Sequence, residues 1–193
     1  MAARSHNTMP AYTALLFQGG IGLVGLIAVW LFAIPVYTGG LSWLQSIAGG
    51  VTGAFATYGA LLLLIRIPGL FPDDIEQQMR GLHKFASGFG WPVLVTLSIF
   101  AGVGEELLFR GAVQGWLAGN VGELTAIIVA SLLFGLVHYI SFTYFLVATS
   151  LGLLLGTVYV VSGSIALVMI WHGVYDIIAL FCLIRFPHWF GVH

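Results

Sequence analysis

Long apolar runs separated by short polar segments constrain this chain more than any other feature of its sequence. One helical crossing of a bilayer needs about 20 predominantly apolar residues. By that measure we expect an all-α fold, a polytopic membrane helix bundle with about six transmembrane helices. The six predicted spans lie near Tyr12–Val36, Leu41–Ile65, Trp91–Leu117, Leu124–His138, Tyr144–Val161 and Ile165–Phe186.

Composition supports a membrane protein and excludes several other classes. Of the 193 residues, 60% are hydrophobic and only 7% are charged, which is more apolar surface than a water-soluble domain of this size can bury. The formal net charge of -1 provides no basic field for nucleic acid, so we expect no nucleic-acid partner. The surroundings of the chain are expected to be membrane lipid.

The segment between the second and third spans, Arg66 to Gly90, is the one long polar connection. Its polar residues alternate with apolar ones at helical spacing, which predicts an amphipathic helix lying in the membrane interface. An even number of crossings places this segment and both termini on one side, and that side carries Arg4, Arg66, Arg80, Lys84 and Arg185. The positive-inside rule makes it cytoplasmic. We therefore expect an integral protein of a prokaryotic cytoplasmic membrane with both termini in the cytoplasm.

No internal repeat or composition change divides the chain, so we expect residues 1–193 to form a single integral-membrane domain. Spaced glycines in the first and fifth spans, such as Gly22, Gly25, Gly152 and Gly156, allow helix backbones to approach closely. This pattern is explained by ordinary packing between membrane helices.

Three ionisable residues, Glu105, Glu106 and Arg110, lie inside the third apolar span. Charges within a bilayer are costly and rare, and they usually mark functional sites. Glu106 and Arg110 are four residues apart with the carboxylate first, which predicts an ion pair along one helix face. Glu105 points about 100° away from Glu106, so its partner must come from another helix. We expect Glu106 to be the structural carboxylate and Glu105 the reactive one.

His172 and Asp176 are also four residues apart, so one helical face presents an imidazole and a carboxylate together. His138, at the end of the fourth span, is a second candidate imidazole. Two chemistries are compatible with these residues. Glu105 could deprotonate a water for attack on a carbonyl that the imidazoles polarise. Alternatively, Glu105, His138 and His172 could hold a zinc ion that activates the water.

Three motifs occur in order on successive apolar segments: Glu-Glu-x-x-x-Arg at 105–110, Phe-x-x-x-His at 134–138 and His-x-x-x-Asp at 172–176. Together they resemble the motifs of the CAAX protease and bacteriocin-processing (CPBP, Abi) family of intramembrane proteases. The resemblance covers residues 99–178, the motif-bearing catalytic core. The three motifs in combination are far more specific than any one of them.

The resemblance implies hydrolysis of a peptide bond at or within the membrane by an intramembrane endopeptidase. In this family Glu105 and His138 would activate the water, and His172 and Asp176 would stabilise the oxyanion. Glu106 would complete the catalytic set, while Arg110 and Phe134 would have structural, orienting roles. A glutamate-type protease without a metal or other cofactor is favoured, and a zinc-dependent version is the alternative.

The expected substrate is a peptide or a lipidated protein. Family members that process prenylated CAAX tails remove the last three residues after the lipidated cysteine, whereas bacterial relatives mature peptides or act in bacteriocin immunity. The length and the number of spans favour a peptide processor of the prokaryotic type. No residue pattern distinguishes these substrates or predicts an oligomeric state.

Asp176 departs from the asparagine that is common at this position in the prenyl-protein branch of the family. Asparagine can donate a hydrogen bond to an oxyanion, whereas aspartate can do so only when protonated. Asp176 is therefore either kept neutral or used to orient His172, and we favour orientation.

Two further hypotheses belong to other classes of protein. A non-catalytic membrane immunity or scaffold protein could keep the same polar residues as a buried network that locks its helices. A proton-coupled transporter could use the buried carboxylates, although the chain lacks the repeat symmetry that is common among transporters.

The predicted helix ends create one conflict. Counted at 1.5 Å per residue, Glu105 lies about 21 Å from the cytoplasmic face, while His138 lies only about 5 to 10 Å from it. These two residues must meet if they share a water. The motif pattern predicts that they do, so we expect one of the helices to start or stop at a different depth.

Overall fold

The computed structural model describes residues 9–71 and 75–192. Within these ranges the chain is helical and contains no strand, as the sequence predicts. Arg4, which contributed to the predicted orientation, lies outside the described residues. The elements are α1 (Ala11–Leu31), α2 (Trp43–Leu64), α3 (Ile75–Ala86), α4 (Trp91–Glu106), η1 (Leu107–Gln114), α5 (Gly115–Val121), α6 (Glu123–Val137), α7 (Phe142–Ser162), α8 (Ile165–Arg185) and η2 (Pro187–Phe190).

Five helices in the described ranges are long and apolar enough to cross a bilayer. They are α1, α2, α7, α8 and the continuous helix Trp91–Val121, which comprises α4, η1 and α5. The fourth predicted span, near Leu124–His138, forms α6 close to its predicted limits, but its 15 residues make it a shorter apolar helix and not a crossing. At 1.5 Å per residue α6 extends about 22 Å, less than the roughly 30 Å hydrocarbon core. The polytopic helical membrane fold is confirmed, with one helix that stops short of a full crossing.

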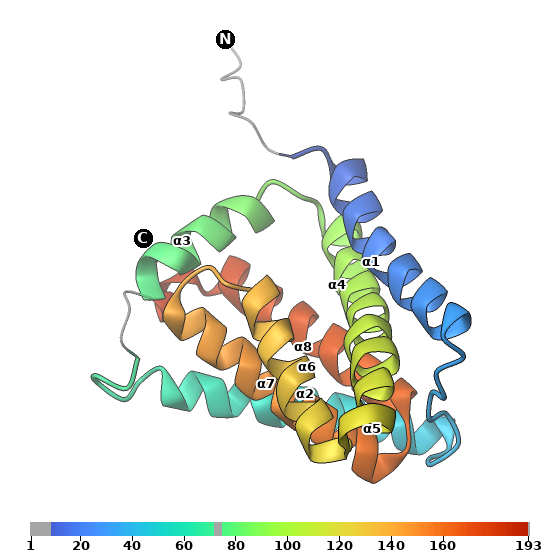
Figure 1. Ribbon diagram of the computed structural model, residues 1–193. Helices are drawn as coiled ribbons and strands as arrows, with labels where there is room; N and C mark the ends of the chain where they lie inside the picture. Colours follow the sequence, from blue (N-terminus) through green and yellow to red (C-terminus); the bar gives the residue numbers. More distant parts are fainter. Residues whose placement is uncertain (1–8, 72–74, 193) are drawn as a thin grey trace.

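Helix α8 occupies the centre of the bundle and packs against both α2 and α4 (Figure 1). Helices α6 and α7 pack against each other, and α1 lies along α4 and η1. The outer surface of α1 consists of large apolar side chains, including Leu16, Phe17 and Trp30, which are mostly exposed. Such a surface is stable in lipid and not in water. The chain is therefore an integral membrane protein.

Close approach between α4 and α8 depends on two glycines. A Cβ atom placed on Gly102 would lie 2.6 Å from the backbone nitrogen of Gly173 and 2.8 Å from its Cα. No side chain fits in that space, so the two backbones are almost in contact. Gly102 precedes Glu106 by one turn and Gly173 follows His172 directly, so this contact sets the distance between the two motif-bearing helices.

Helix α3 is the amphipathic helix that the sequence predicts between the second and third spans. Met79, Leu82 and Ala86 lie on its covered face, whereas Gln77 and Lys84 are exposed. It packs against α8 and the C-terminal η2. In Figure 1 it lies across one end of the bundle.

The helix geometry changes directly after the two glutamates. Leu107–Gln114 forms a π-helix between α4 and α5. Wider turns of this kind are uncommon and are found frequently at functional sites. The sequence analysis predicted one uninterrupted span here, since the segment contains no proline and its single glycine, Gly111, is a residue type that is frequent in membrane helices.

Candidate active site

Glu106, the last residue of α4, links two helices through one oxygen. Its Oε1 accepts a hydrogen bond from Arg110 Nη1 at 2.9 Å and a second from His172 Nδ1 at 2.8 Å. All three side chains are buried, with exposures of 0%, 1% and 3%. The ion pair with Arg110 agrees with the prediction from their spacing. The bond to His172 was not predicted, because it depends on how α4 and α8 pack.

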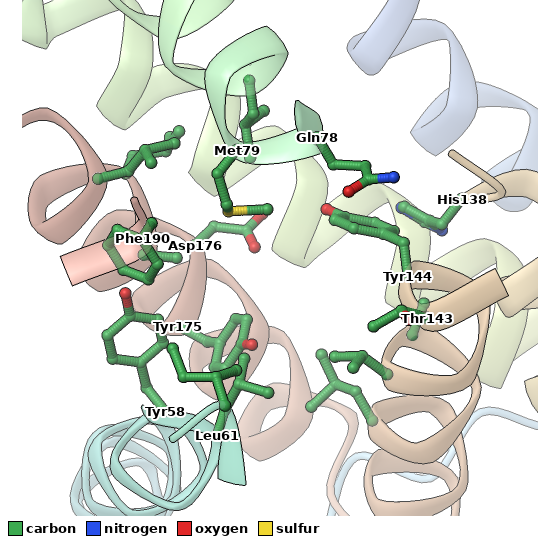
Figure 2. Close-up of a pocket in the computed structure, with 18 of the residues that line it drawn as sticks. Tyr58, Leu61, Gln78, Met79, His138, Thr143, Tyr144, Tyr175, Asp176 and Phe190 are labelled. Carbon is green, nitrogen blue, oxygen red and sulfur yellow. The ribbon is translucent and has the colours of Figure 1, made fainter. Parts of the chain in front are cut away.

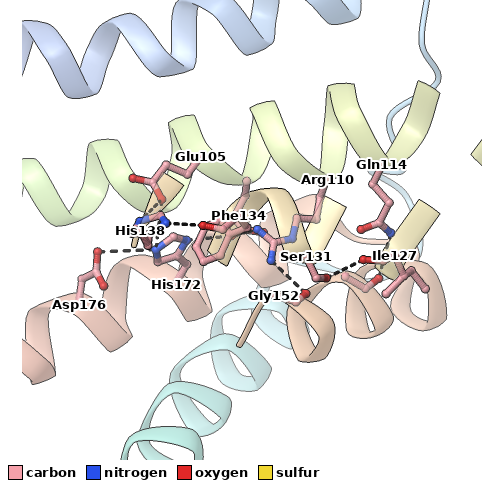
Figure 3. Close-up of polar contacts among 12 residues, drawn as sticks. Glu105, Arg110, Gln114, Ile127, Ser131, Phe134, His138, Gly152, His172 and Asp176 are labelled. Carbon is pink, nitrogen blue, oxygen red and sulfur yellow. Dashed lines mark hydrogen bonds and ion pairs between the residues drawn. The ribbon is translucent and has the colours of Figure 1, made fainter. Parts of the chain in front are cut away.

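Arg110 is fixed by further contacts within the protein. Its Nη2 donates to the carbonyl oxygen of Gly152 on α7 at 3.1 Å, and its Cζ lies 4.7 Å from the centre of the Phe134 ring. The Phe134 ring also packs edge-on against His172, with centroids 5.7 Å apart. Figure 3 shows Phe134 and Arg110 beside the two imidazoles. The structural, orienting roles of Arg110 and Phe134 stay predictions.

Glu105 is buried, with 6% exposure, and meets residues from three other parts of the chain. Its Oε1 accepts a hydrogen bond from Gln18 Nε2 of α1 at 2.6 Å. Its Oε2 lies 3.4 Å from His138 Nε2 and 3.9 Å from His172 Nε2. The partners do come from other helices, as the sequence analysis requires. Gln18 was missed, although a single glutamine within an apolar span was a signal that could have been followed.

His138 caps the C-terminal end of α6, and its ring is held by the preceding turn. Its Nδ1 lies 2.8 Å from the carbonyl oxygen of Phe134. Since a carbonyl oxygen only accepts, Nδ1 carries the proton and Nε2 faces Glu105. Helix α6 ends within one residue of its predicted end, and His138 Nε2 lies 3.4 Å from Glu105 Oε2. The two residues therefore meet, as the motifs predict, and the separation in depth counted from the predicted helix ends was wrong.

His172 and Asp176 share a face of α8, as their spacing predicts. Since Glu106 is an acceptor at Nδ1 of His172, the imidazole Nε2 points towards the other two carboxylates. Asp176 Oδ2 lies 3.7 Å from this Nε2, beyond ordinary hydrogen-bond distance. The shorter contact that fixes the His172 ring is the one to Glu106. An orienting role for Asp176 stays a prediction.

A cavity of about 290 Å³ lies against this cluster. Glu105, His138, His172 and Asp176 all contribute to its wall, and most of the remaining lining is apolar. Figure 2 shows side chains entering it from α2, α3, α7, α8 and η2. A second cavity of about 240 Å³ lies between α2 and α7 and shares Leu61, Phe71, Val147, Leu151 and Tyr175 with the first.

Glu105, His138 and His172 are the residues that a zinc ion would use as ligands in the zinc-dependent alternative. Both imidazoles have their Nδ1 held by an acceptor, an arrangement typical of metal ligands. Zinc, however, requires its ligand atoms at about 2.0 to 2.3 Å from one point. Within residues 9–71 and 75–192 no group of three His, Cys, Asp or Glu side chains has a spacing that could hold a metal ion. As they are arranged, the side chains of Glu105, His138 and His172 do not fit the coordination that a zinc ion requires.

The fold and site define an integral membrane protein with a buried Glu-His-His-Asp cluster at an internal cavity. Comparison with known proteins agrees with this class. Residues 87–178 match the model of the type II CAAX prenyl endopeptidase Rce1-like family, which confirms the predicted resemblance. The matched segment contains all three motifs and runs from the end of α3 to the middle of α8.

A curated relative is similar over a longer segment. The chain is 33% identical over 121 residues to the uncharacterized protein YpbD of Bacillus subtilis (strain 168). This alignment covers 61% of the present chain and 59% of YpbD, so the chain spans less than two thirds of that relative. No solved structure matches the chain.

Proposed function

We propose that this protein is an intramembrane endopeptidase that hydrolyses a peptide bond near the C-terminus of a membrane-associated or lipidated peptide or protein. The observation that carries the proposal is the position of Glu105 Oε2, which faces the Nε2 atoms of His138 and His172 at the wall of the cavity. A carboxylate and two imidazoles that converge on one accessible space are suited to activating water.

Glu105 acts as the general base. Its Oε2 takes a proton from a water bound beside it, and the water oxygen forms a bond to the scissile carbonyl carbon. The hydrogen bond from Gln18 to Oε1 holds the carboxylate in place and leaves Oε2 directed towards His138. His138 positions the water through Nε2, because its Nδ1 is committed to the Phe134 carbonyl.

His172 stabilises the negative charge that develops on the carbonyl oxygen. As the carbon–oxygen double bond becomes a single bond, its electron pair moves to that oxygen. A protonated Nε2 of His172 donates a hydrogen bond to it, and the Glu106 carboxylate at Nδ1 stabilises the imidazolium. Asp176 supports the cationic form of His172 from the other side.

Breakdown of the tetrahedral intermediate returns the proton. The carboxylic acid of Glu105 transfers its proton to the leaving nitrogen, and the carbon–nitrogen bond breaks as the carbonyl double bond forms again. The products are a new carboxylic acid and a free amine, which become a carboxylate and an ammonium when the acid's proton passes to the amine, and Glu105 is again ionised. No oxidant, metal or other cofactor takes part in these steps.

The apolar cavities favour a substrate with a lipid or other apolar chain. The second cavity adjoins the catalytic one, because the two share lining residues of α2 and α7, and its lining is almost entirely apolar. An isoprenoid or acyl chain placed there would leave the adjacent peptide beside Glu105.

We further propose that the site is in a prokaryotic cytoplasmic membrane. Helix α3 packs against the C-terminal η2, and we place both, together with the N-terminus, on the cytoplasmic side.

The test is cleavage of a peptide library by purified wild-type protein and by Glu105→Gln. The library contains peptides with a farnesylated cysteine followed by three residues and the same peptides without the lipid. We expect cleavage by the wild type, loss of at least 100-fold in Glu105→Gln, no effect of a chelator and no bound metal. Loss on chelation with recovery on adding zinc would replace the metal-free mechanism by the zinc-dependent one.

The alternative is a non-catalytic immunity or scaffold protein, and one observation favours it. The buried network of Glu106, Arg110 and His172 joins α4 and α8 and would stabilise the bundle without any chemistry. Absence of cleavage by the wild type, together with a Glu105→Gln protein that retains its biological effect, would support this alternative and contradict the protease.

A further inference from the structure

The amphipathic helix α3 places one polar side chain in the catalytic cavity. Gln78 lies on the covered face of α3 with Met79 and Leu82, and all three line the cavity. Figure 2 shows the Gln78 amide extending from α3 into the space that His138, Tyr144 and Asp176 also border. The neighbouring Gln77 is exposed on the opposite side of the same helix.

The Gln78 amide has no hydrogen-bond partner in the described part of the chain. Its Oε1 is buried and accepts no hydrogen bond, and no hydrogen bond links either end of the amide to the described residues. A buried polar atom without a partner destabilises a folded protein, so such groups are uncommon unless a ligand or water satisfies them. Gln114, which is fully buried, also has an Oε1 without a partner, but its Nε2 donates to the Gly156 carbonyl.

The chemistry of this amide complements a peptide backbone. A carboxamide offers an acceptor oxygen and two N–H donors side by side, which match the N–H and C=O of one peptide unit. Gln78 is the one carboxamide among the described residues that line the catalytic cavity. The carboxylates and imidazoles there are already assigned to water activation and to the oxyanion, and an ionised carboxylate can accept but not donate.

We infer that Gln78 is a substrate-positioning residue that hydrogen-bonds a backbone amide of the substrate next to the scissile bond. This inference rests on the proposed function. A peptide that enters a largely apolar cavity loses the water bound to its backbone groups, and each such group needs a new partner. Gln78 supplies that partner from α3, a helix that lies outside the three sequence motifs.

The first test compares Gln78→Met with Gln77→Met, using a fluorogenic peptide that carries a farnesylated cysteine and three further residues. Methionine keeps the length of the side chain and removes the amide. We expect Gln78→Met to raise KM about tenfold with kcat within about twofold of the wild type. Gln77→Met, on the exposed face of the same helix, should leave both constants unchanged. Equal kinetics for the two variants would overturn the inference.

A double-mutant cycle separates substrate binding from a structural role. The peptide is N-methylated at one backbone position at a time and offered to the wild type and to Gln78→Met. We expect one N-methylation to raise the wild-type KM about tenfold and to have little further effect on the variant. A purely structural glutamine would give additive effects at every position, which would contradict the proposal. Gln78→Leu, which removes both the acceptor and the donors, should behave like Gln78→Met and provides a second variant if that protein is poorly produced.

Failure of this inference and failure of the proposed function give different results. Wild-type cleavage with normal Gln78→Met kinetics overturns only the role of Gln78. Absence of cleavage by the wild type on every library peptide overturns the protease, and the role of Gln78 with it.

Discussion

His172 on α8 donates its Nδ1–H to Glu106 on α4 at 2.8 Å, and both side chains are almost completely buried. This contact determines the direction of the imidazole, because it leaves Nε2 directed towards Glu105 and the cavity. It also connects the two helices whose backbones meet at Gly102 and Gly173. Catalytic geometry and helix packing therefore depend on the same interface.

Replacing Gly102 by alanine should separate α4 from α8. The added Cβ would meet the Gly173 backbone at 2.6 Å, and backbone atoms cannot move aside as a side chain can. We expect a loss of stability of about 1 to 3 kcal/mol and a fall in cleavage of more than tenfold. The matched control is Gly59→Ala on α2, where nothing lies within 4 Å. Thermal unfolding in detergent and peptide cleavage are the measurements, and equal behaviour of the two variants would contradict this account.

The two adjacent glutamates should respond differently to the same substitution. Glu106→Gln leaves the Arg110 guanidinium buried without its carboxylate, which we expect to destabilise the protein by about 3 kcal/mol. Glu105→Gln should fold normally and lose cleavage, since its carboxylate is needed for chemistry and not for packing. Membrane levels and thermal midpoints of both variants, measured beside their activities, check this division. A reversed order of stabilities would show that the roles have been exchanged.

Asp176 offers a comparison with the asparagine that is common in the prenyl-protein branch. Asp176→Asn can donate a hydrogen bond to the oxyanion, so we expect it to retain cleavage within about tenfold of the wild type. Asp176→Ala removes the group entirely and should reduce kcat by 100-fold or more. The measurement is the kcat of each variant with one peptide. If alanine is tolerated as well as asparagine, Asp176 has no role in the reaction.

Filling the second cavity should affect lipidated substrates selectively. Leu154 lines the second cavity and not the catalytic one, and Leu154→Trp would occupy space proposed for the lipid chain. We expect cleavage of a farnesylated peptide to fall at least tenfold, while the peptide without the lipid is cleaved at the wild-type rate. The ratio of kcat/KM for the two peptides is the measurement. An equal decrease for both would place the lipid elsewhere.

The proposed orientation can be tested with a single accessible thiol. Cys182 is the native cysteine of α8 and is first replaced by serine. Gln77→Cys then places a thiol on the exposed face of α3. We expect a membrane-impermeant maleimide to label it in inverted membrane vesicles and not in intact cells. Labelling from outside intact cells would reverse the topology.

Contacts along a single helix were predictable from the sequence, because the α-helix fixes which residues share a face. The spacing of Glu106 and Arg110 predicted their ion pair, and that of His172 and Asp176 placed both at one cavity. The length of the apolar runs predicted the polytopic helical fold for the same reason, since the thickness of a bilayer sets the length of a crossing.

Contacts between helices were decided only by the tertiary structure. The bond from His172 to Glu106 and that from Gln18 to Glu105 join residues 66 and 87 positions apart in the chain. The meeting of His138 with Glu105 was also decided there, because residue counts along the separate helices had placed the two at different depths. Local sequence therefore determined which chemical groups this protein carries and on which helix faces they lie. The packing of separate helices decided which of those groups meet, because close contact between backbones depends on the shapes of both partners.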